Sequence, residues 1–86
     1  MHRTTGQFWQ RHDALPRDIQ EQSHKAFALL KANPKHPSLH FKKVGAFWSA
    51  RIGQAYRTPA IEDGEDLIWV WIGTHAEYER ILRSRQ

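Results

Sequence analysis

The fold of this 86-residue chain is decided by the segment Leu67-Ile-Trp-Val-Trp-Ile-Gly-Thr-His-Ala-Glu-Tyr-Glu-Arg-Ile-Leu82, which joins a strand to a helix. Its first six residues are all apolar, so we expect a strand that is covered on both faces and lies in the centre of a sheet. Trp69 and Trp71 share one face of this strand, where large apolar residues are usually core. The alternative for these two indoles is stacking on single-stranded bases.

A helix follows this strand directly. Thr74-His-Ala-Glu77 is a capping box, which predicts a terminal helix from His75 to about Arg83. At the first helical position, the helix dipole favours a neutral imidazole on His75 that can act as a general base, beside backbone amides that bind phosphate. The other interpretation is an ordinary surface histidine. Tyr78, one turn later, would stack on a base or donate a proton, or else anchor the helix to the sheet.

Two helices are predicted before the strands. The first runs from Thr5 to Asp13, because apolar residues recur at helical spacing behind a threonine that can cap. The second runs from Pro16, which suits a first helical position, to about Ala32, where Asn33-Pro34 stops it. Met1 to Thr4 shows hardly any strand pattern.

After the second helix the apolar period becomes strand-like. We expect a meander of four short strands near Leu39 to Val44, Phe47 to Ile52, Gln54 to Ala60 and Leu67 to Ile72. The last two strands are joined by an acidic hairpin loop from Glu62 to Asp66, and Pro59 predicts an edge or a bulge because it lacks a ladder donor. The pattern predicts one α+β domain over residues 1–86, with two N-terminal helices packed on a small antiparallel sheet of three to four strands and a short C-terminal helix.

The composition restricts the class of protein. Eighty-six residues leave room for one core and one site. The chain has no cysteine, which excludes disulfides and thiolate metal sites and fits a reducing cytosol. It begins without the apolar stretch of a signal peptide and contains no run of membrane-spanning length, so we expect a soluble, cytoplasmic protein with no membrane partner.

The net charge of +4 is unevenly distributed along the chain. From Gln22 to Ile61 there is no aspartate or glutamate, and this block carries seven positive charges: Lys25, Lys31, Lys35, Lys42, Lys43, Arg51 and Arg57. A basic block that includes predicted strands is the pattern expected for a partner such as nucleic acid. The alternative is a solvated basic surface.

Arg51 and Arg57 lie on neighbouring predicted strands, and the turn between them decides whether they meet. A two-residue loop at Gly53-Gln54 would point them to opposite faces, whereas a three-residue loop from Gly53 to Ala55 would place them opposite each other as a phosphate clamp. In a third interpretation, one arginine pairs with Glu62 or Asp66 at the end of the sheet.

Other polar residues restrict the chemistry further. Lys42 and Lys43 are consecutive on a strand, so only one of them can line a given groove. His36 and His40 are four residues apart, but Pro37 denies them a common helical face and no carboxylate supports them, so we predict no metal site and no cofactor. The chain shows no Ser-His-Asp order and no glycine-rich phosphate loop, which argues against common hydrolases and nucleotide-binding folds.

After these exclusions, the chemistry that the sequence favours is histidine-assisted catalysis by basic residues on a phosphate chain. RNA supplies its own nucleophile, the 2′-hydroxyl, so a protein needs only a base, a cation for the pentavalent phosphate and a group that orients the nucleotide. His75, the two arginines and Tyr78 could fill these roles.

Four segments, in order, resemble the RelE/ParE superfamily of toxins from type II toxin-antitoxin systems. They are Leu15-Pro-Arg-Asp-Ile-Gln20, Lys25-Ala-Phe-Ala-Leu-Leu-Lys-Ala-Asn-Pro-Lys-His-Pro-Ser-Leu-His-Phe-Lys42, Trp48-Ser-Ala-Arg-Ile-Gly-Gln-Ala-Tyr-Arg57 and Trp71-Ile-Gly-Thr-His-Ala-Glu-Tyr78. The resemblance runs from about Phe8 to Leu82. It implies two helices on an antiparallel sheet, a short C-terminal helix, and a cognate antitoxin protein that wraps the toxin and masks its basic surface.

The resemblance also implies an activity. The RNA-cleaving branch of this superfamily acts on messenger RNA in the ribosomal decoding site. Arg57 matches the phosphate-binding arginine, Arg51 a basic position on the preceding strand, and His75 the catalytic histidine of the branch with Gly-Thr-His; the family's tyrosine falls near Ile81 rather than at Tyr78. We therefore expect a ribosome-dependent mRNA endoribonuclease. The alternatives are a ParE-like inhibitor of DNA gyrase that acts by binding alone, and a degenerate member without toxicity.

The candidate residues divide by role. The catalytic candidates are His75, Arg57, Arg51 and Tyr78, and the RNA-binding candidates are Lys42 and Lys43.

Overall fold

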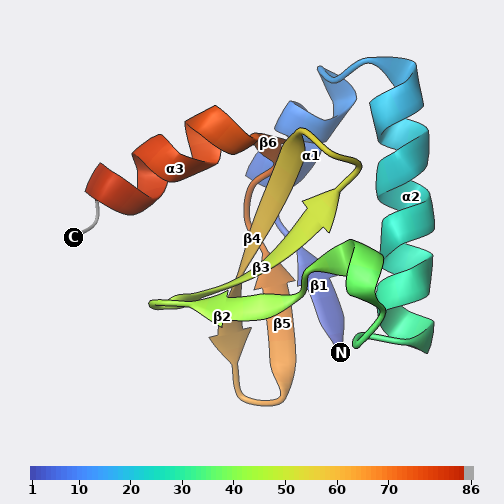
Figure 1. The fold of residues 1–86 in the computed structure, drawn as a ribbon. Helices are drawn as coiled ribbons and strands as arrows, with labels where there is room; N and C mark the ends of the chain where they lie inside the picture. The colour runs from blue at the N-terminus through green and yellow to red at the C-terminus, as the bar shows by residue number, and fades with distance from the viewer. Residues whose placement is uncertain (85–86) are drawn as a thin grey trace.

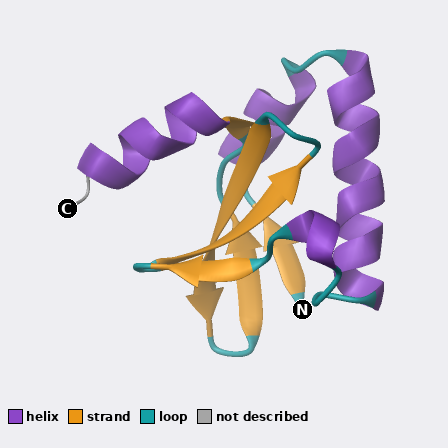
Figure 2. Ribbon diagram, viewed as in Figure 1, coloured by secondary structure: helices purple, strands orange, loops and turns teal. Residues whose placement is uncertain are grey.

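The computed structural model describes residues 1–84, which form three α-helices and a six-stranded sheet (Figures 1 and 2). In chain order the elements are β1 (His2–Thr4), α1 (Gly6–Asp13), α2 (Arg17–Ala32), the short 3-10 helix η1 (Pro37–Leu39), β2 (Lys42–Val44), β3 (Phe47–Ile52), β4 (Tyr56–Asp63), β5 (Asp66–Trp69), β6 (Gly73–Thr74) and α3 (His75–Ser84). The α+β class and the two N-terminal helices are as expected.

The sheet is larger than the sequence predicts and it is mixed. Its strand order is β1-β5-β4-β3-β2, and β6 pairs with β4 beyond the end of β5. β2, β3, β4 and β5 form antiparallel pairs, but β1 runs parallel to β5. The expected antiparallel sheet of three to four strands is therefore wrong in both number and direction, although β5 does lie inside the sheet.

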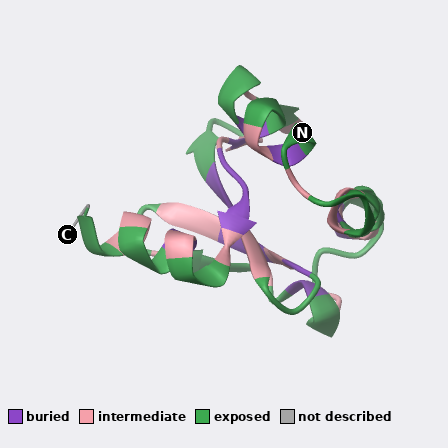
Figure 3. Ribbon diagram, turned by 90° about the horizontal axis from the view of Figure 1, so that it is seen from above, coloured by how far each residue is buried: buried purple, intermediate pink, exposed green. Residues whose placement is uncertain are grey.

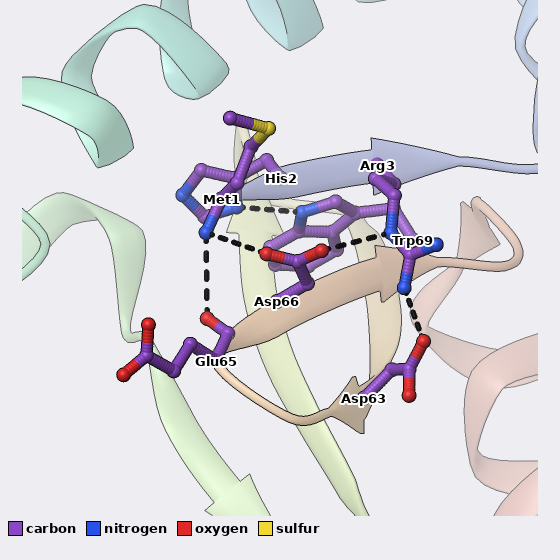
Figure 4. Close-up of polar contacts among 7 residues, drawn as sticks. All are labelled: Met1, His2, Arg3, Asp63, Glu65, Asp66 and Trp69. Carbon is purple, nitrogen blue, oxygen red and sulfur yellow. Dashed lines mark hydrogen bonds and ion pairs between the residues drawn. The ribbon is translucent and has the colours of Figure 1, made fainter.

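β1 is the strand that the sequence pattern missed, because three residues are too few to show an alternation. Its backbone continues the ladder on β5: Leu67 N–H donates to the Met1 carbonyl at 2.9 Å, and Thr5 N–H donates to the Trp69 carbonyl at 3.2 Å. Arg3 forms ion pairs with Asp63 and Asp66 of the acidic hairpin, and the Trp69 indole donates to His2 Nδ1 at 3.0 Å (Figure 4). The acidic loop is thus partly neutralised by the first strand.

The strand expected from Leu67 to Ile72 ends at Trp69 as β5, and strand pairing begins again only at β6, from Gly73. Between the two strands, residues 70–72 face only residues 58–59 of β4, since Ala60 pairs with Trp69 and Arg57 with Gly73. Val70 N–H donates to the Pro59 carbonyl, and the Thr58 hydroxyl donates to the Trp71 carbonyl. The extra residue is a bulge, as expected opposite a proline that lacks a ladder donor.

Because of the bulge, the two indoles lie in different surroundings. The expectation that they share one face of the strand is therefore wrong. Trp69 is fully buried in the main core, whereas Trp71 packs beneath the guanidinium of Arg11, whose carbon lies 4.5 Å from the indole centre. Both indoles are buried, as expected.

The main core lies between α1, α2 and one face of the sheet. Phe8 and Leu30 from the helices meet side chains of β3, β4 and β5, and the buried cluster consists of Phe8, Leu30, Leu39, Ala50, Ile52, Ala60, Trp69 and Ile72. Figure 3 shows burial concentrated where the strands meet and the helices largely exposed on their outer sides. The opposite face of the sheet carries α3, which contacts β4 and β6.

Helix boundaries agree closely with the expected ranges. Thr5 caps α1 by accepting a hydrogen bond from Phe8 N–H, Pro16 precedes α2 as its N-cap, and α3 begins at His75. The strand expected from Leu39 is shorter, because Pro37 begins η1 and the strand starts only at Lys42. Among the described helices, none combines the length and hydropathy that crossing a lipid bilayer requires.

Candidate functional site

The register of the β3-β4 hairpin settles the relation between the two arginines. Ile52 pairs with Tyr56, which leaves Gly53 to Ala55 as a three-residue loop with Gly53 at a φ of +62°. Arg51 therefore pairs directly with Arg57, and cross-strand partners project from the same face of a sheet. Both side chains therefore leave the sheet on the face that bears α3, and Arg51 turns back to the hairpin loop, where its Nε donates to the Gly53 carbonyl at 2.8 Å.

No carboxylate of residues 1–84 forms an ion pair with either arginine. Glu62 contacts the Lys43 amine at 3.3 Å and the Trp48 indole, and Asp66 pairs with Arg3. The alternative in which Glu62 or Asp66 neutralises one arginine is therefore wrong. Two adjacent like charges repel each other across a strand pair, an arrangement that is tolerable at an anion site.

His75 is held beside Arg57 by its backbone. β6 pairs Thr74 with Tyr56 and Gly73 with Arg57, and the next residue, His75, donates its N–H to the Ala55 carbonyl at 2.8 Å. The histidine therefore begins α3 while still attached to the β3-β4 loop. A ladder contact is a more rigid support than a free loop would provide.

The segment before His75 is clamped from the other side by Arg11 of α1. Arg11 Nε donates to the Ile72 carbonyl at 2.9 Å, and its Nη2 lies 3.2 Å from Glu77 Oε2. Gly73 fits between Arg11 and Trp71, because a Cβ at this position would lie 2.6 Å from Trp71 Cζ2 and 3.0 Å from Arg11 Nη2. Only glycine leaves this close approach free of overlap.

The predicted capping box is confirmed. Glu77 N–H donates to Thr74 Oγ1 at 3.2 Å, and Thr74 N–H donates to Glu77 Oε1 at 3.0 Å. The backbone hydrogen bond from Thr74, assisted by the Thr74 hydroxyl and Arg11, holds the pKa of Glu77 below its ordinary value against the opposing effect of desolvation. The start of α3 is thus fixed independently of any ligand.

The His75 side chain contacts one cation and one anion. Arg57 Nε donates to His75 Nδ1 at 3.3 Å, and His75 Nε2 lies 2.9 Å from Glu79 Oε1, one helical turn later. The side chains of His75 and Glu79 are 51% and 50% exposed, so the imidazole is accessible to a ligand. In the neutral ring this arrangement places the proton on Nε2 and leaves the Nδ1 lone pair facing Arg57.

Sequence reasoning weighed His40 only as a metal ligand and missed its contact with an arginine of the site. Its Nε2 lies 3.4 Å from Arg51 Nη1, so it flanks one arginine as His75 flanks the other. Desolvation, followed by the positive charges of Arg51, Arg57 and Lys42, lowers the pKa of His40. Nothing in the sequence indicated this position, because it depends on the left-handed backbone of His40. The contact of Glu79 with His75 could have been found from its four-residue spacing.

Lys42 and Lys43 project from opposite faces of the sheet, as consecutive strand residues must. Lys42 pairs with Ser49 and Lys43 with Trp48, so Lys42 projects from the face that carries Arg51 and Arg57. Lys43 is on the other face, where its amine contacts Glu62. The Trp48 indole and then Lys43 lower the pKa of Glu62. We therefore retain Lys42 as an RNA-binding candidate and assign Lys43 to a surface ion pair.

Tyr78 is placed away from these groups. It is 4% exposed, and its hydroxyl has no hydrogen-bond partner among the described residues. A buried ring on α3 secures the helix to the sheet and does not present its hydroxyl to a ligand at the surface. Of the two interpretations of Tyr78, the structure favours anchoring over catalysis.

A groove of mixed polar and apolar surface runs along the same face of the sheet, beside α3. It has a volume of about 460 Å³, and its lining includes Phe47, Pro59, Ile61, Trp71 and Ile81. Ile61, on this lining, is 43% exposed. The face therefore combines a basic cluster at the start of α3 with an apolar surface along the helix.

Comparison with known proteins identifies the fold. No protein-family model matches the sequence, and no curated protein matches it significantly. Solved structures do match. YafQ from E. coli strain BL21(DE3) has a TM-score of 0.68 at 15% identity, covering 91% of this chain and 96% of YafQ. RelE in the RelB-RelE antitoxin-toxin complex from Methanococcus jannaschii has a TM-score of 0.71 at 13% identity, covering 92% and 96%.

A third match, the YoeB/ParE toxin from Agrobacterium tumefaciens, has a TM-score of 0.64 at 15% identity and covers 86% of this chain and 97% of that toxin. The chain therefore has the fold of the RelE/ParE superfamily toxins along nearly its whole length. The fold expected from the resemblance is confirmed by solved structures that share only 13–15% identity with this chain.

Proposed function

We propose that this protein is the toxin of a type II toxin-antitoxin system and that it is a metal-independent endoribonuclease that cleaves messenger RNA on the ribosome. The observation that carries the proposal is the arginine pair, Arg51 beside Arg57, with His75 hydrogen-bonded to Arg57 and half exposed. Uncompensated guanidinium groups on one face bind a phosphate, and the adjacent imidazole transfers a proton.

The chemistry requires no group from outside the protein and its RNA. The 2′-hydroxyl loses its proton and attacks the neighbouring phosphorus, the bond to the 5′-oxygen breaks, and that oxygen takes up a proton. Arg51 and Arg57 stabilise the charge that develops on the pentavalent phosphate, and Lys42 holds a neighbouring phosphate of the strand. Tyr78 is left out of the mechanism because it is buried.

The same face supports the proposal of an antitoxin partner. The apolar part of the groove beside α3 would take apolar side chains of an amphipathic segment, and acidic residues of that segment would meet Arg51, Arg57 and Lys42. The structurally similar RelE from Methanococcus jannaschii was solved with its antitoxin RelB. An antitoxin bound in this way would cover the basic cluster and prevent phosphate binding.

The proposal is tested by inducing the protein in bacteria and mapping the 5′ ends of messenger RNA. We expect codon-phased cuts from the wild-type protein and a loss of about 10²–10³-fold in cleavage for Arg57→Ala, the range found when one transition-state donor is removed. His75→Ala should also abolish the cuts. Arg17→Ala, at an exposed position at the start of α2, is the control and should cleave normally.

Two results would contradict the nuclease proposal. An SOS response with intact transcripts would indicate a gyrase inhibitor that acts by binding. Unimpaired growth with confirmed expression would indicate a non-toxic member.

A further inference from the structure

A small pocket lies on the other face of the sheet from the arginine pair, between α1, α2 and β1. Its volume is about 180 Å³. Six aromatic or imidazole rings form most of its wall: His2, Phe8, Trp9, His24, Phe27 and Trp69. Pockets for drug-sized ligands begin at about 300 Å³, so this one has room for a single ring-sized group. The proposed cleavage uses none of these residues.

Trp9 and His24 are the outer wall of the pocket. Trp9 is 41% exposed, yet its ring is held in place, because its Nε1 donates to Thr4 Oγ1 at 2.8 Å. The Trp9 and His24 ring centres are 6.5 Å apart, with the ring planes inclined by 30°. Both side chains are exposed and line the pocket, so a planar ring can lie against them. Aromatic and imidazole rings at a surface are the groups on which unpaired bases stack.

A buried imidazole beside this wall has unused hydrogen-bonding capacity. The His12 ring centre lies 5.0 Å from that of Trp9 and 5.2 Å from that of His24. His12 is 2% exposed, and its Nε2 has no hydrogen-bond partner among residues 1–84. Buried polar atoms nearly always have a partner, so this nitrogen needs an explanation that a polar atom of a ligand would provide.

The lysines of α2 and the turn after it supply positive charge that the arginine face does not use. Lys25, Lys31 and Lys35 belong to the block without acidic residues, and none of them forms an ion pair with a carboxylate within residues 1–84. Lys31 lines the pocket. Desolvation, followed by the charges of the N-terminal amine and Lys31, lowers the pKa of His2 on the same wall. The pocket therefore favours a ligand that joins a planar ring to a negative charge.

We propose that this pocket binds one nucleotide, with its base stacked on Trp9 and His24 and its phosphate on Lys31. A nucleotide joins a flat, polar-edged ring to a phosphate through one sugar, which matches rings, an unpartnered imidazole and a cation in one place. An apolar side chain of a protein partner would fill the pocket but would leave Lys31 and His12 without a partner. The site is separate from the arginine pair and does not depend on RNA cleavage. Its nucleotide is either free or part of an RNA strand.

A first experiment titrates adenosine monophosphate into ¹⁵N-labelled protein and follows the Trp9 indole and the His24 imidazole by NMR. We expect both signals to shift with one common midpoint. Ribose 5-phosphate lacks the base and should leave both signals in place. His36, whose Nδ1 bonds to Ser38, is the internal control. The proposal is wrong if neither signal responds to adenosine monophosphate, or if ribose 5-phosphate shifts them equally.

Substitutions then test the two halves of the ligand, with the His24 signal as the reporter. Trp9→Ala should weaken adenosine monophosphate binding about 5–150-fold, the range for the loss of one stacked base, whereas Trp9→Phe keeps an aromatic face and should retain most of the affinity. Lys31→Ala changes no ring and should also weaken binding. Lys35→Ala removes the same charge outside the pocket lining and should bind as the wild type does. Equal losses from both lysine substitutions would show only general attraction to α2 and would overturn the proposal. Thermal unfolding of each variant verifies that the fold is retained.

A last comparison separates this pocket from the arginine face and identifies the source of its nucleotide. Arg57→Ala should leave the His24 shift unchanged, and loss of that shift would mean that no separate site exists. An adenosine trinucleotide with 2′-O-methyl riboses cannot be cleaved through a 2′-hydroxyl. Tighter binding of this trinucleotide than of the mononucleotide would assign the pocket to an RNA strand, and equal or weaker binding would assign it to a free nucleotide. If the wild-type protein cleaves no RNA, the proposed function fails, and these titrations still decide whether the pocket binds a nucleotide.

Discussion

Gly73 sets the position of His75 through the space that its missing side chain leaves. The Trp71 ring and the Arg11 guanidinium both occupy the volume that a Cβ would need. We expect Gly73→Ala to lower the free energy of unfolding by about 1–3 kcal/mol, the usual cost of overpacking, because a bulky ring and a clamped arginine must both move. Urea denaturation followed by tryptophan fluorescence would measure the loss.

The control for this substitution is Gly6→Ala at the start of α1, where nothing lies within 4 Å of the added Cβ. It should leave the stability unchanged or raise it slightly. Equal destabilisation by both substitutions would show that Gly73 has no special packing role.

For individual residues, the positions on strands and helices were predictable from the sequence, but several contacts were not. The positions of Arg51, Arg57 and His75 were predictable from strand and helix patterns, but the register between the arginines was not, because two turn lengths fitted the sequence equally well. The part played by His40 depends on one backbone conformation that no spacing reveals. Tyr78 shares a helix with His75, yet its burial is decided by tertiary packing.

At the scale of the element, α3 depends on its capping box for its first turn. We expect Thr74→Ala to lower the free energy of unfolding by about 1 kcal/mol near neutral pH, because it removes the hydroxyl that caps Glu77 N–H. The stabilisation contributed by Glu77 has a defined pH dependence. Because its pKa is lowered in the folded state, that stabilisation is complete above the ordinary glutamate range and is lost as the pH falls through the lowered pKa.

Chemical denaturation of Glu77→Gln and the wild-type protein at a series of pH values would check this dependence. The difference in stability should be largest near neutral pH and should disappear in acid. Glu21→Gln, an exposed substitution on α2, should show no such convergence. A constant difference across the whole range would mean that the Glu77 charge is not involved.

The elements themselves were predictable to different degrees. All three helices were expected within one or two residues of their observed ends, because capping residues and prolines mark them. β1 was missed because its stability comes from a partner at the far end of the sequence. Pro59 predicted an edge strand or a bulge, and the structure has the bulge with β4 inside the sheet. The effect of the bulge on Trp71 was not predicted, since one added residue reverses the face of every side chain that follows.

For the whole molecule, the separation of charge is the feature with the clearest functional consequence. Asp63 and Asp66 are engaged by β1, while Lys42, Arg51 and Arg57 share an open face of the sheet. We expect the affinity for single-stranded RNA to fall with salt, and Lys42→Ala to reduce the slope of log K against log salt by about 0.7, the value for one phosphate contact.

Fluorescence anisotropy with a labelled RNA at several salt concentrations would give both slopes. Lys43→Ala is the matched control, because the neighbouring lysine lies on the other face and contacts Glu62. If the two lysines changed the slope equally, the RNA would not be confined to the arginine face.

The distance along the chain between β1 and β5 has a consequence for the order of folding. The β3-β4 hairpin, with both arginines, is a local contact that closes over a short loop, whereas β1 must wait for a partner near the other end of the sequence. β6 and α3, which bring His75 to the hairpin, come later still. During synthesis we therefore expect Arg51 to pair with Arg57 before His75 is brought beside them, so the proposed phosphate contacts form before the proposed group for proton transfer.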